Sequence, residues 1–218
     1  MITKQTKENL SETFLTGLSG IFNISGYKSI FFANWATVVP IVISILTVFI
    51  SFALKVDAFN LISECKSLMI SFLPNILGFT IAGYSLMVGF IQAGMLDQIT
   101  EPSDDSKFSL YQEMSSTFAV NVILQGISLI IAFFIHFVIY MDTNSHFGLV
   151  LPEWYKLIVN YIGLLIISYW FAVSVFMVIQ IVLNIFGFSQ LHHYFVNKHK
   201  IELQEKEDAK INDQGKEN

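Results

Sequence analysis

The sequence contains no arginine and only one cysteine, and each scarcity removes a class of function. All twelve basic residues of the 218-residue chain are lysines, and the formal net charge is −5. Without a guanidinium, the chain lacks the usual bidentate ligand for phosphate and guanine, so we do not expect direct nucleic-acid binding. The single Cys65 cannot form an intrachain disulfide or a cysteine-based zinc site.

Charge of either sign is also scarce. Charged residues make up 13% of the chain, about half the ~25% share of a soluble domain. They are absent from four long runs: 29–54, 67–96, 114–141 and 157–191. A membrane-spanning helix needs about 20 apolar residues, and each run is longer than that. The sequence therefore predicts an all-α, polytopic membrane protein with four transmembrane helices.

These runs divide the chain into a lead-in (1–28), a transmembrane domain (29–191) and a charged cytoplasmic tail (192–218). Residues 8–24 place apolar side chains at near-helical spacing, which indicates a short interfacial helix or, alternatively, a frayed segment. The expected outer connections are residues 55–66 and 142–156.

Local signals mark several helix boundaries. Pro40 falls inside the first span, because the residues after it are too few to cross a bilayer. Ser109 and Gln112 fit a capping box at the start of the third helix, and Pro152 suits the first turn of the fourth. In the tail, the pair Glu202–Lys206 supports a short helical extension. The last residues, 211–218, have too little apolar surface to order themselves.

The second span carries small side chains at helical spacing. Such a stripe lets another helix approach closely, because contact between helices in lipid depends on van der Waals fit. We name it the small-residue seam and predict that it is a helix-packing face, without assigning its partner. Its members are Gly78, Ala82, Ser85, Gly89 and Ala93.

The third span carries a polar seam at similar spacing, and the fourth span adds Asn160, Ser168, Ser174, Gln180 and Asn184. Amides in hydrocarbon must face protein or water. Two interpretations stay open: hydrogen bonds that hold helices together, or the lining of a wetted pore or cavity. The polar seam consists of Asn121, Gln125, Ser128 and His136.

No arrangement in the sequence indicates an enzyme, a metal site or a cofactor. Gly83-Tyr84-Ser85 resembles part of the serine motif of rhomboid intramembrane proteases, with His136 as an imaginable base. The two residues are expected at very different membrane depths, which rules out a hydrogen bond between them. Three tail histidines, His192, His193 and His199, lack the further ligands of a tetrahedral metal site.

Lysine counts predict the orientation. The lead-in, the 97–113 loop and the tail together hold nine lysines, against three in the two outer connections. By the positive-inside rule, both termini are expected in the cytoplasm.

The layout along the whole chain resembles the small four-span membrane subunit of the Kiwa bacterial antiphage defence system. The similarity rests on the lead-in GLSGIFNISGYKSIFFANW, the four spans, the short outer loops and the tail HHYFVNKHKIELQEKEDAK. The resemblance implies a non-enzymatic sensor and scaffold of the bacterial inner membrane. It also implies self-assembly, for which a tetramer is the working number, and a cytosolic DNA-binding effector as partner. The alternative function is a small homo-oligomeric ion channel or transporter subunit.

The predicted orientation can be tested with fused reporters. Reporters that are active only in the cytoplasm are expected to work after Asn218 and near Ser106, whereas periplasmic reporters are expected to work near Ser145. The reverse pattern would overturn the argument from lysine counts.

Overall fold

The computed structural model describes residues 15–26, 34–91, 99–100, 107–144 and 152–214. These residues form five helices and no strand, which confirms the all-α prediction. The helices are α2 (Gly17–Ser25), α3 (Trp35–Ala53), α4 (Ala58–Gly89), α6 (Leu110–Asn144) and α7 (Glu153–Gln214). All except α2 are long and apolar enough to cross a membrane.

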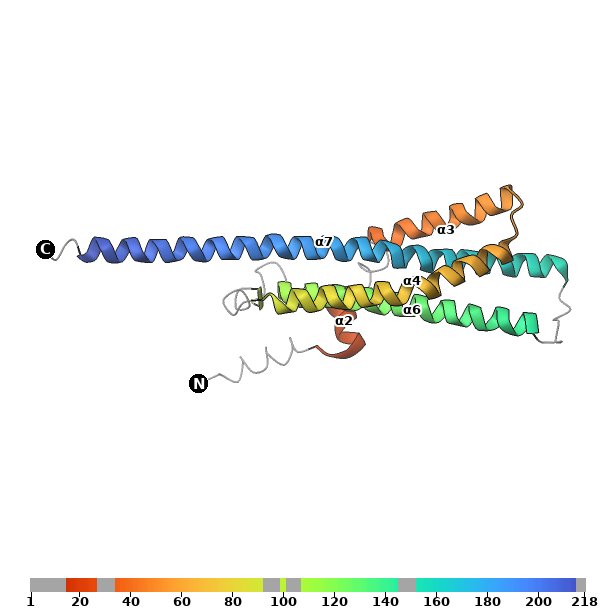
Figure 1. The fold of residues 1–218 in the computed structure, drawn as a ribbon, viewed down its shortest axis with the longest axis horizontal. Coiled ribbons are helices and arrows are strands. Elements are labelled where there is room, and N and C mark those ends of the chain that lie inside the picture. The colour runs from red at the N-terminus through yellow and green to blue at the C-terminus, as the bar shows by residue number, and fades with distance from the viewer. Residues whose placement is uncertain (1–14, 27–33, 92–98, 101–106, 145–151, 215–218) are drawn as a thin grey trace.

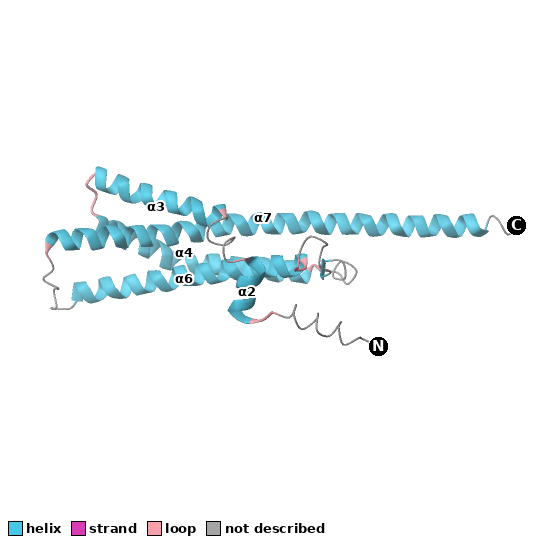
Figure 2. Ribbon diagram, turned by 180° about the vertical axis from the view of Figure 1, so that it is seen from behind, coloured by secondary structure: helices cyan, strands magenta, loops and turns pink. Residues whose placement is uncertain are grey.

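The four long helices form an elongated antiparallel bundle around α7 (Figure 1). Helix α7 packs against α3, α4 and α6, and α4 also packs against α6. The start of α6 and the extended end of α7 lie at one end of the bundle, and the α3–α4 turn lies at the other. Seen from behind in Figure 2, α2 lies beside α6, against which it packs.

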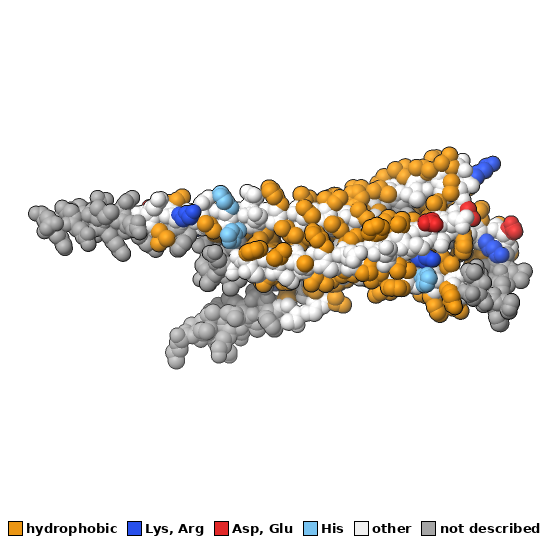
Figure 3. Space-filling model, in the orientation of Figure 1, with side chains coloured by type: hydrophobic (Ala, Val, Ile, Leu, Met, Phe, Trp, Pro, Cys, Tyr) orange, Lys and Arg blue, Asp and Glu red, His pale blue; other side chains and the backbone are white. Residues whose placement is uncertain are grey.

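The lateral surface of the bundle is apolar, as Figure 3 shows, and the described charged side chains lie toward its ends. Large side chains such as Phe49 and Phe134, each 66% exposed, point away from the bundle. A soluble monomer rarely exposes contiguous apolar surface of this extent. With four helices of sufficient length, the chain is a multi-pass membrane protein.

The helix starts follow the local signals. Ser109 and Gln112 form the predicted capping box: the backbone N–H of Ser109 donates to Gln112 Oε1 at 3.0 Å, and the Gln112 N–H donates to Ser109 Oγ at 3.3 Å. Pro40 lies inside α3, as expected. Helix α7 begins at Glu153, directly after Pro152.

One outer connection is shorter than the sequence suggested. We expected a loop over 55–66, but α4 begins at Ala58, so that only a tight turn follows α3. Asp57 caps α4, because its Oδ1 accepts from the backbone N–H of Phe59 at 2.9 Å. Lys55 carries a positive φ of 54° in this turn. The charged residues Glu64 and Lys66 precede the apolar run of the second span, but they lie inside α4 and do not mark its start.

The tail was misjudged only near its end. Helix α7 includes the predicted extension at Glu202–Lys206, and it continues without a break to Gln214, past residue 210, where we expected order to stop. Its 62 residues correspond to about 93 Å at ~1.5 Å per residue, roughly three times the hydrocarbon thickness. A helix already nucleated by the bundle extends at low cost, which a composition argument for an isolated segment does not capture.

Only part of the predicted lead-in helix lies within the described residues. Helix α2 covers Gly17–Ser25, and residues 1–14 lie outside the described ranges. Ile21 and Phe22 pack against a core cluster that includes Val120 and Met177. The lead-in helix is therefore attached to the bundle and is not a frayed segment over these residues.

Candidate functional site

Three members of the polar seam are completely buried inside the bundle. Asn121, Gln125 and Ser128 are exposed by 1%, 0% and 0%, respectively. Gln125 Oε1 accepts a hydrogen bond from Thr80 Oγ1 of α4 at 2.9 Å. Ser128 Oγ donates to the Leu124 carbonyl at 2.8 Å and lies 3.3 Å from the Trp170 carbonyl of α7. These contacts between α4, α6 and α7 fit the interpretation of interhelical hydrogen bonding.

His136 does not join the other three residues. It is exposed, while Ala132 is fully buried, and Ile135 and Ile139 continue the packed face of α6. An α-helix has 3.6 residues per turn, so side chains placed at repeated intervals of four residues move gradually off one face of the helix. The sequence spacing therefore overextended the polar seam by one residue.

Two side-chain amides of the seam lack a complete set of partners. Asn121 Nδ2 and Gln125 Nε2 are buried atoms without a hydrogen-bond acceptor. Leaving such a donor unpaired costs roughly 1–3 kcal/mol. The Thr80 hydroxyl, which also lies 3.0 Å from the Ile76 carbonyl, offers one proton to two acceptors. The centre of the bundle is thus polar but incompletely paired.

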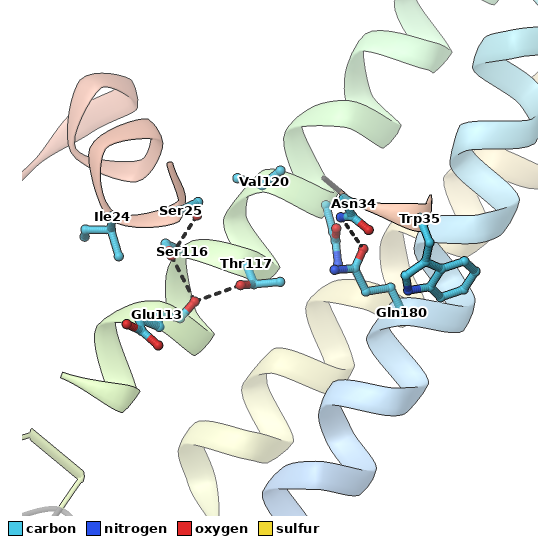
Figure 4. Close-up of a pocket in the computed structure, with 10 residues that line it drawn as sticks. Ile24, Ser25, Asn34, Trp35, Glu113, Ser116, Thr117, Val120 and Gln180 are labelled. Atoms are coloured by element: carbon cyan, nitrogen blue, oxygen red, sulfur yellow. Dashed lines mark hydrogen bonds between the residues drawn. The ribbon is translucent and has the colours of Figure 1, made fainter. Parts of the chain in front are cut away.

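A cavity of about 440 Å³ lies next to the Asn121 end of the polar seam. It is bounded by α2, α6, the start of α3 and α7. Figure 4 shows its two walls: Ser25 of α2 points at Ser116 of α6, and Asn34 points at Gln180 of α7. The Oγ–Oγ distance of the serine pair is 2.8 Å, and Asn34 Nδ2 donates to Gln180 Oε1 at 3.0 Å. The lining residues are Ile24, Ser25, Asn34, Trp35, Glu113, Ser116, Thr117, Val120, Asn121 and Gln180.

Asn34 also starts α3. Its Oδ1 accepts from the Ala36 backbone N–H at 3.0 Å, which makes it the N-cap of that helix. The next residue, Trp35, is 42% exposed and packs edge-on against Phe176, with ring centroids 5.7 Å apart. One asparagine therefore fixes both the beginning of the first span and its attachment to α7.

Apolar packing closes the bundle on the far side of the polar seam. Beyond Ser128, the fully buried Ala132, Leu164 and Ile167 pack together with Met69 and Leu73. Over the described residues of one chain, the buried polar side chains of α6 stop short of the end that carries the α3–α4 turn. The buried polar face of α6 therefore ends at Ser128 within the described residues.

The described members of the small-residue seam face away from the other described helices. Gly78, Ala82, Ser85 and Gly89 are exposed, and a Cβ atom built at either glycine meets nothing within 4 Å. Ala93 lies outside the described ranges. The contact between α4 and α7 uses Gly83 instead, where a Cβ would lie 2.9 Å from Ile185 Cδ1.

The serine and the histidine considered for proteolysis are far apart. Because Thr80 meets Gln125 and the two helices are antiparallel, Ser85 lies toward one end of the bundle and His136 toward the other, roughly 24 Å apart at ~1.5 Å per residue. Ser85 Oγ donates to the Ile81 carbonyl at 2.9 Å. In the tail, His193 lies 3.3 Å from Asn197. The described residues contain no group of three potential metal ligands.

Sequence reasoning missed Asn34 and Thr80. Asn34 precedes the apolar run at an N-cap position, which is a readable signal. Thr80 looked like one of many hydroxyls in a membrane helix, and only its pairing with Gln125 makes it notable.

Comparisons with known proteins give no relative. No family model matches the chain, and neither a curated protein nor a solved structure is significantly similar to it.

The buried pair predicts an asymmetric response to mutation. Thr80→Val removes the one hydrogen bond that the Gln125 side chain makes with the described residues, and it is expected to lower the free energy of unfolding by about 1–3 kcal/mol. Gln125→Leu removes the incompletely paired amide and leaves Thr80 its Ile76 acceptor, so its cost is expected to be smaller. Thermal unfolding in one detergent checks the order; equal losses would contradict it.

Proposed function

We propose that the chain is a non-enzymatic membrane subunit that senses an event at the bacterial inner membrane and holds a cytosolic effector protein. The observation that carries the proposal is the continuity of α7, which runs from Glu153 to Gln214 as one helix. Its last 23 residues extend about 35 Å beyond Leu191, where the apolar run ends. A helix of this kind offers a rigid attachment for a partner.

The same helix contacts every other span and carries Gln180 of the cavity wall. A change in packing within the bundle would therefore reach the tail through unbroken backbone, without a flexible linker between them. At the opposite end, the described connection is only the turn of a few residues that joins α3 to α4. This asymmetry supports an output on the side of the tail.

The resemblance to the Kiwa membrane subunit supports the biological setting of the proposal. In that setting both termini are cytoplasmic, the trigger is phage infection, and the partner is a DNA-binding effector. The lysine distribution supports the same orientation.

Self-association is supported by the exposed part of the small-residue seam, which none of the described helices covers. Small residues on a lipid-facing surface permit close approach of a helix from another copy.

An ion channel or transporter subunit is the alternative function. The unpaired amides of Asn121 and Gln125 favour it, because they would be satisfied by water. The test is ion flux through the purified protein in liposomes. A flux that is abolished by Gln125→Leu would favour the channel or transporter over the scaffold.

Truncation tests the role of the tail. Deletion of His199–Asn218 is expected to leave membrane insertion and self-assembly intact, because the bundle contacts lie before this segment. Capture of a co-expressed cytosolic protein encoded by an adjacent gene is expected to fall to background. Capture by the truncated chain at full yield would place docking elsewhere, on the 97–113 loop or the lead-in.

Substitution tests the small-residue seam. Gly89→Leu adds bulk where a second copy would approach, and it is expected to weaken the oligomer measured by cross-linking or native mass spectrometry. Gly187→Leu is the matched control, because Gly187 of α7 is also exposed, has nothing within 4 Å and lies outside the seam. An unchanged oligomer in the Gly89 variant would mean that the seam faces lipid.

A further inference from the structure

Lys66 is a lysine on the buried face of a membrane-spanning helix. It is only 8% exposed and shares this face of α4 with the buried Ile62 and Met69, whereas Glu64 is exposed about 160° away around the helix. Lys66 makes no hydrogen bond or ion pair with the described residues, but its Nζ retains accessible surface. The stem of the side chain is therefore packed, and the ammonium is open to a further partner. An ionisable side chain in this position of a membrane helix marks a candidate binding site.

Helical register places Lys66 close to His136 of α6. Thr80 of α4 meets Gln125 of α6, and the two helices are antiparallel. Lys66 is therefore level with about Ile139, and His136 lies within about one helical turn of that level. The apolar cluster that joins the two helices at this end includes Ile139, which agrees with the register.

The rotation of the two helices turns both side chains to the same side. Gly83 of α4 and Ser128 of α6 are positions that contact α7. Lys66 lies roughly 100° from Gly83 around α4, and His136 lies roughly 80° from Ser128 around α6, in each case past the contact between α4 and α6. Both side chains therefore emerge on the face of the α4–α6 pair that points away from α7. Figure 3 shows lysine and histidine side chains next to each other toward the end with the α3–α4 turn.

This pair of side chains lies at the edge of the hydrocarbon region. The charge-free run of α4 begins at residue 67, and that of α6 ends at residue 141. By the same register, the two ends are level to within about one turn. Tyr140, which is 60% exposed at this level, is typical of the aromatic belt at a membrane–water boundary. The phosphate groups of phospholipids lie at such a boundary.

The two side chains offer donors that suit a phosphate. The lysine ammonium has three donors and no acceptor, and a histidine ring carries at least one N–H. We propose that Lys66 and His136 bind the phosphate of an anionic phospholipid such as phosphatidylglycerol. One acyl chain then lies along Phe133 of α6, which is 51% exposed and one turn further into the membrane. Phosphatidylcholine is disfavoured, because its choline cation is repelled by the lysine ammonium. This inference does not depend on the proposed function.

The test is a lipid titration of the purified full-length protein, followed by native mass spectrometry. Phosphatidylglycerol and phosphatidylcholine with identical acyl chains are compared, and soluble glycerol 3-phosphate is added as a competitor. Phosphatidylglycerol is expected to bind about tenfold more tightly than phosphatidylcholine, the effect of one hydrogen bond to a charged group. Glycerol 3-phosphate is expected to compete poorly, because it has no acyl chain to contact the helices.

Variants locate the bound lipid. Lys66→Met keeps an apolar stem of similar length, and it is expected to weaken phosphatidylglycerol binding about tenfold and to remove the preference over phosphatidylcholine. His136→Leu is expected to weaken the binding of both lipids about fivefold, because both contain a phosphate. Lys156→Met is the matched control, since it removes an exposed lysine of α7 at the same end of the bundle, and it should change neither value. Because His136 is exposed, its variant is informative even where Lys66→Met fails to fold.

Four outcomes would overturn the inference. The first is equal binding of the two lipids by the unaltered protein. The second is a preference for phosphatidylglycerol that Lys66→Met leaves intact. The third is an equal loss of this preference in Lys156→Met, which would indicate a general effect of surface charge. The fourth is full competition by glycerol 3-phosphate, which would identify a free phosphate rather than a lipid as the ligand.

Discussion

Polar groups placed in hydrocarbon must find partners inside the protein, and this requirement shapes the described bundle. Asn34 satisfies it twice, because its Oδ1 caps α3 and its Nδ2 donates to Gln180. That single residue ties the start of the first span to α7, the helix that contacts every other span. Thr80 and Gln125 do the same between α4 and α6. The remaining contacts between the helices are apolar, as in the core cluster that contains Ala132 and Leu164.

The same requirement explains why the incomplete pairs are informative. Many serine and threonine side chains in the spans donate to a carbonyl of their own helix, as Ser168 does to the Leu164 carbonyl at 2.6 Å. Such bonds need no other helix and indicate no ligand. The Nδ2 of Asn121 makes no such bond and finds no acceptor among the described residues. Asn121 lines the cavity between α2, α3 and α6, whereas the apolar cluster begins beyond Ser128.

Much of the fold follows from sequence because the controlling physics is local. Long charge-free runs identify the four spans, and the Ser109–Gln112 box marks the start of α6. The errors arise where helix and membrane boundaries differ. Lys66 was assigned to a loop, yet it lies in α4 and is only 8% exposed. A charge ends the apolar run but does not end the helix, since lysine is a good helix former whose stem packs on apolar surface.

The candidate site was less predictable, because it depends on how helices rotate against one another. Spacing correctly grouped Asn121, Gln125 and Ser128, which share the buried face of α6, but it could not show that His136 lies off that face. Nor could spacing show that Gly83, rather than Gly89 of the small-residue seam, packs against another helix of the chain. Gly83 meets Ile185 of α7, whereas Gly89 meets nothing. Gly83 therefore takes part in packing within the chain, whereas Gly89 leaves an exposed surface among the described residues. In a membrane, where apolar burial does not drive helices together, shape fit between such surfaces decides which of them find partners.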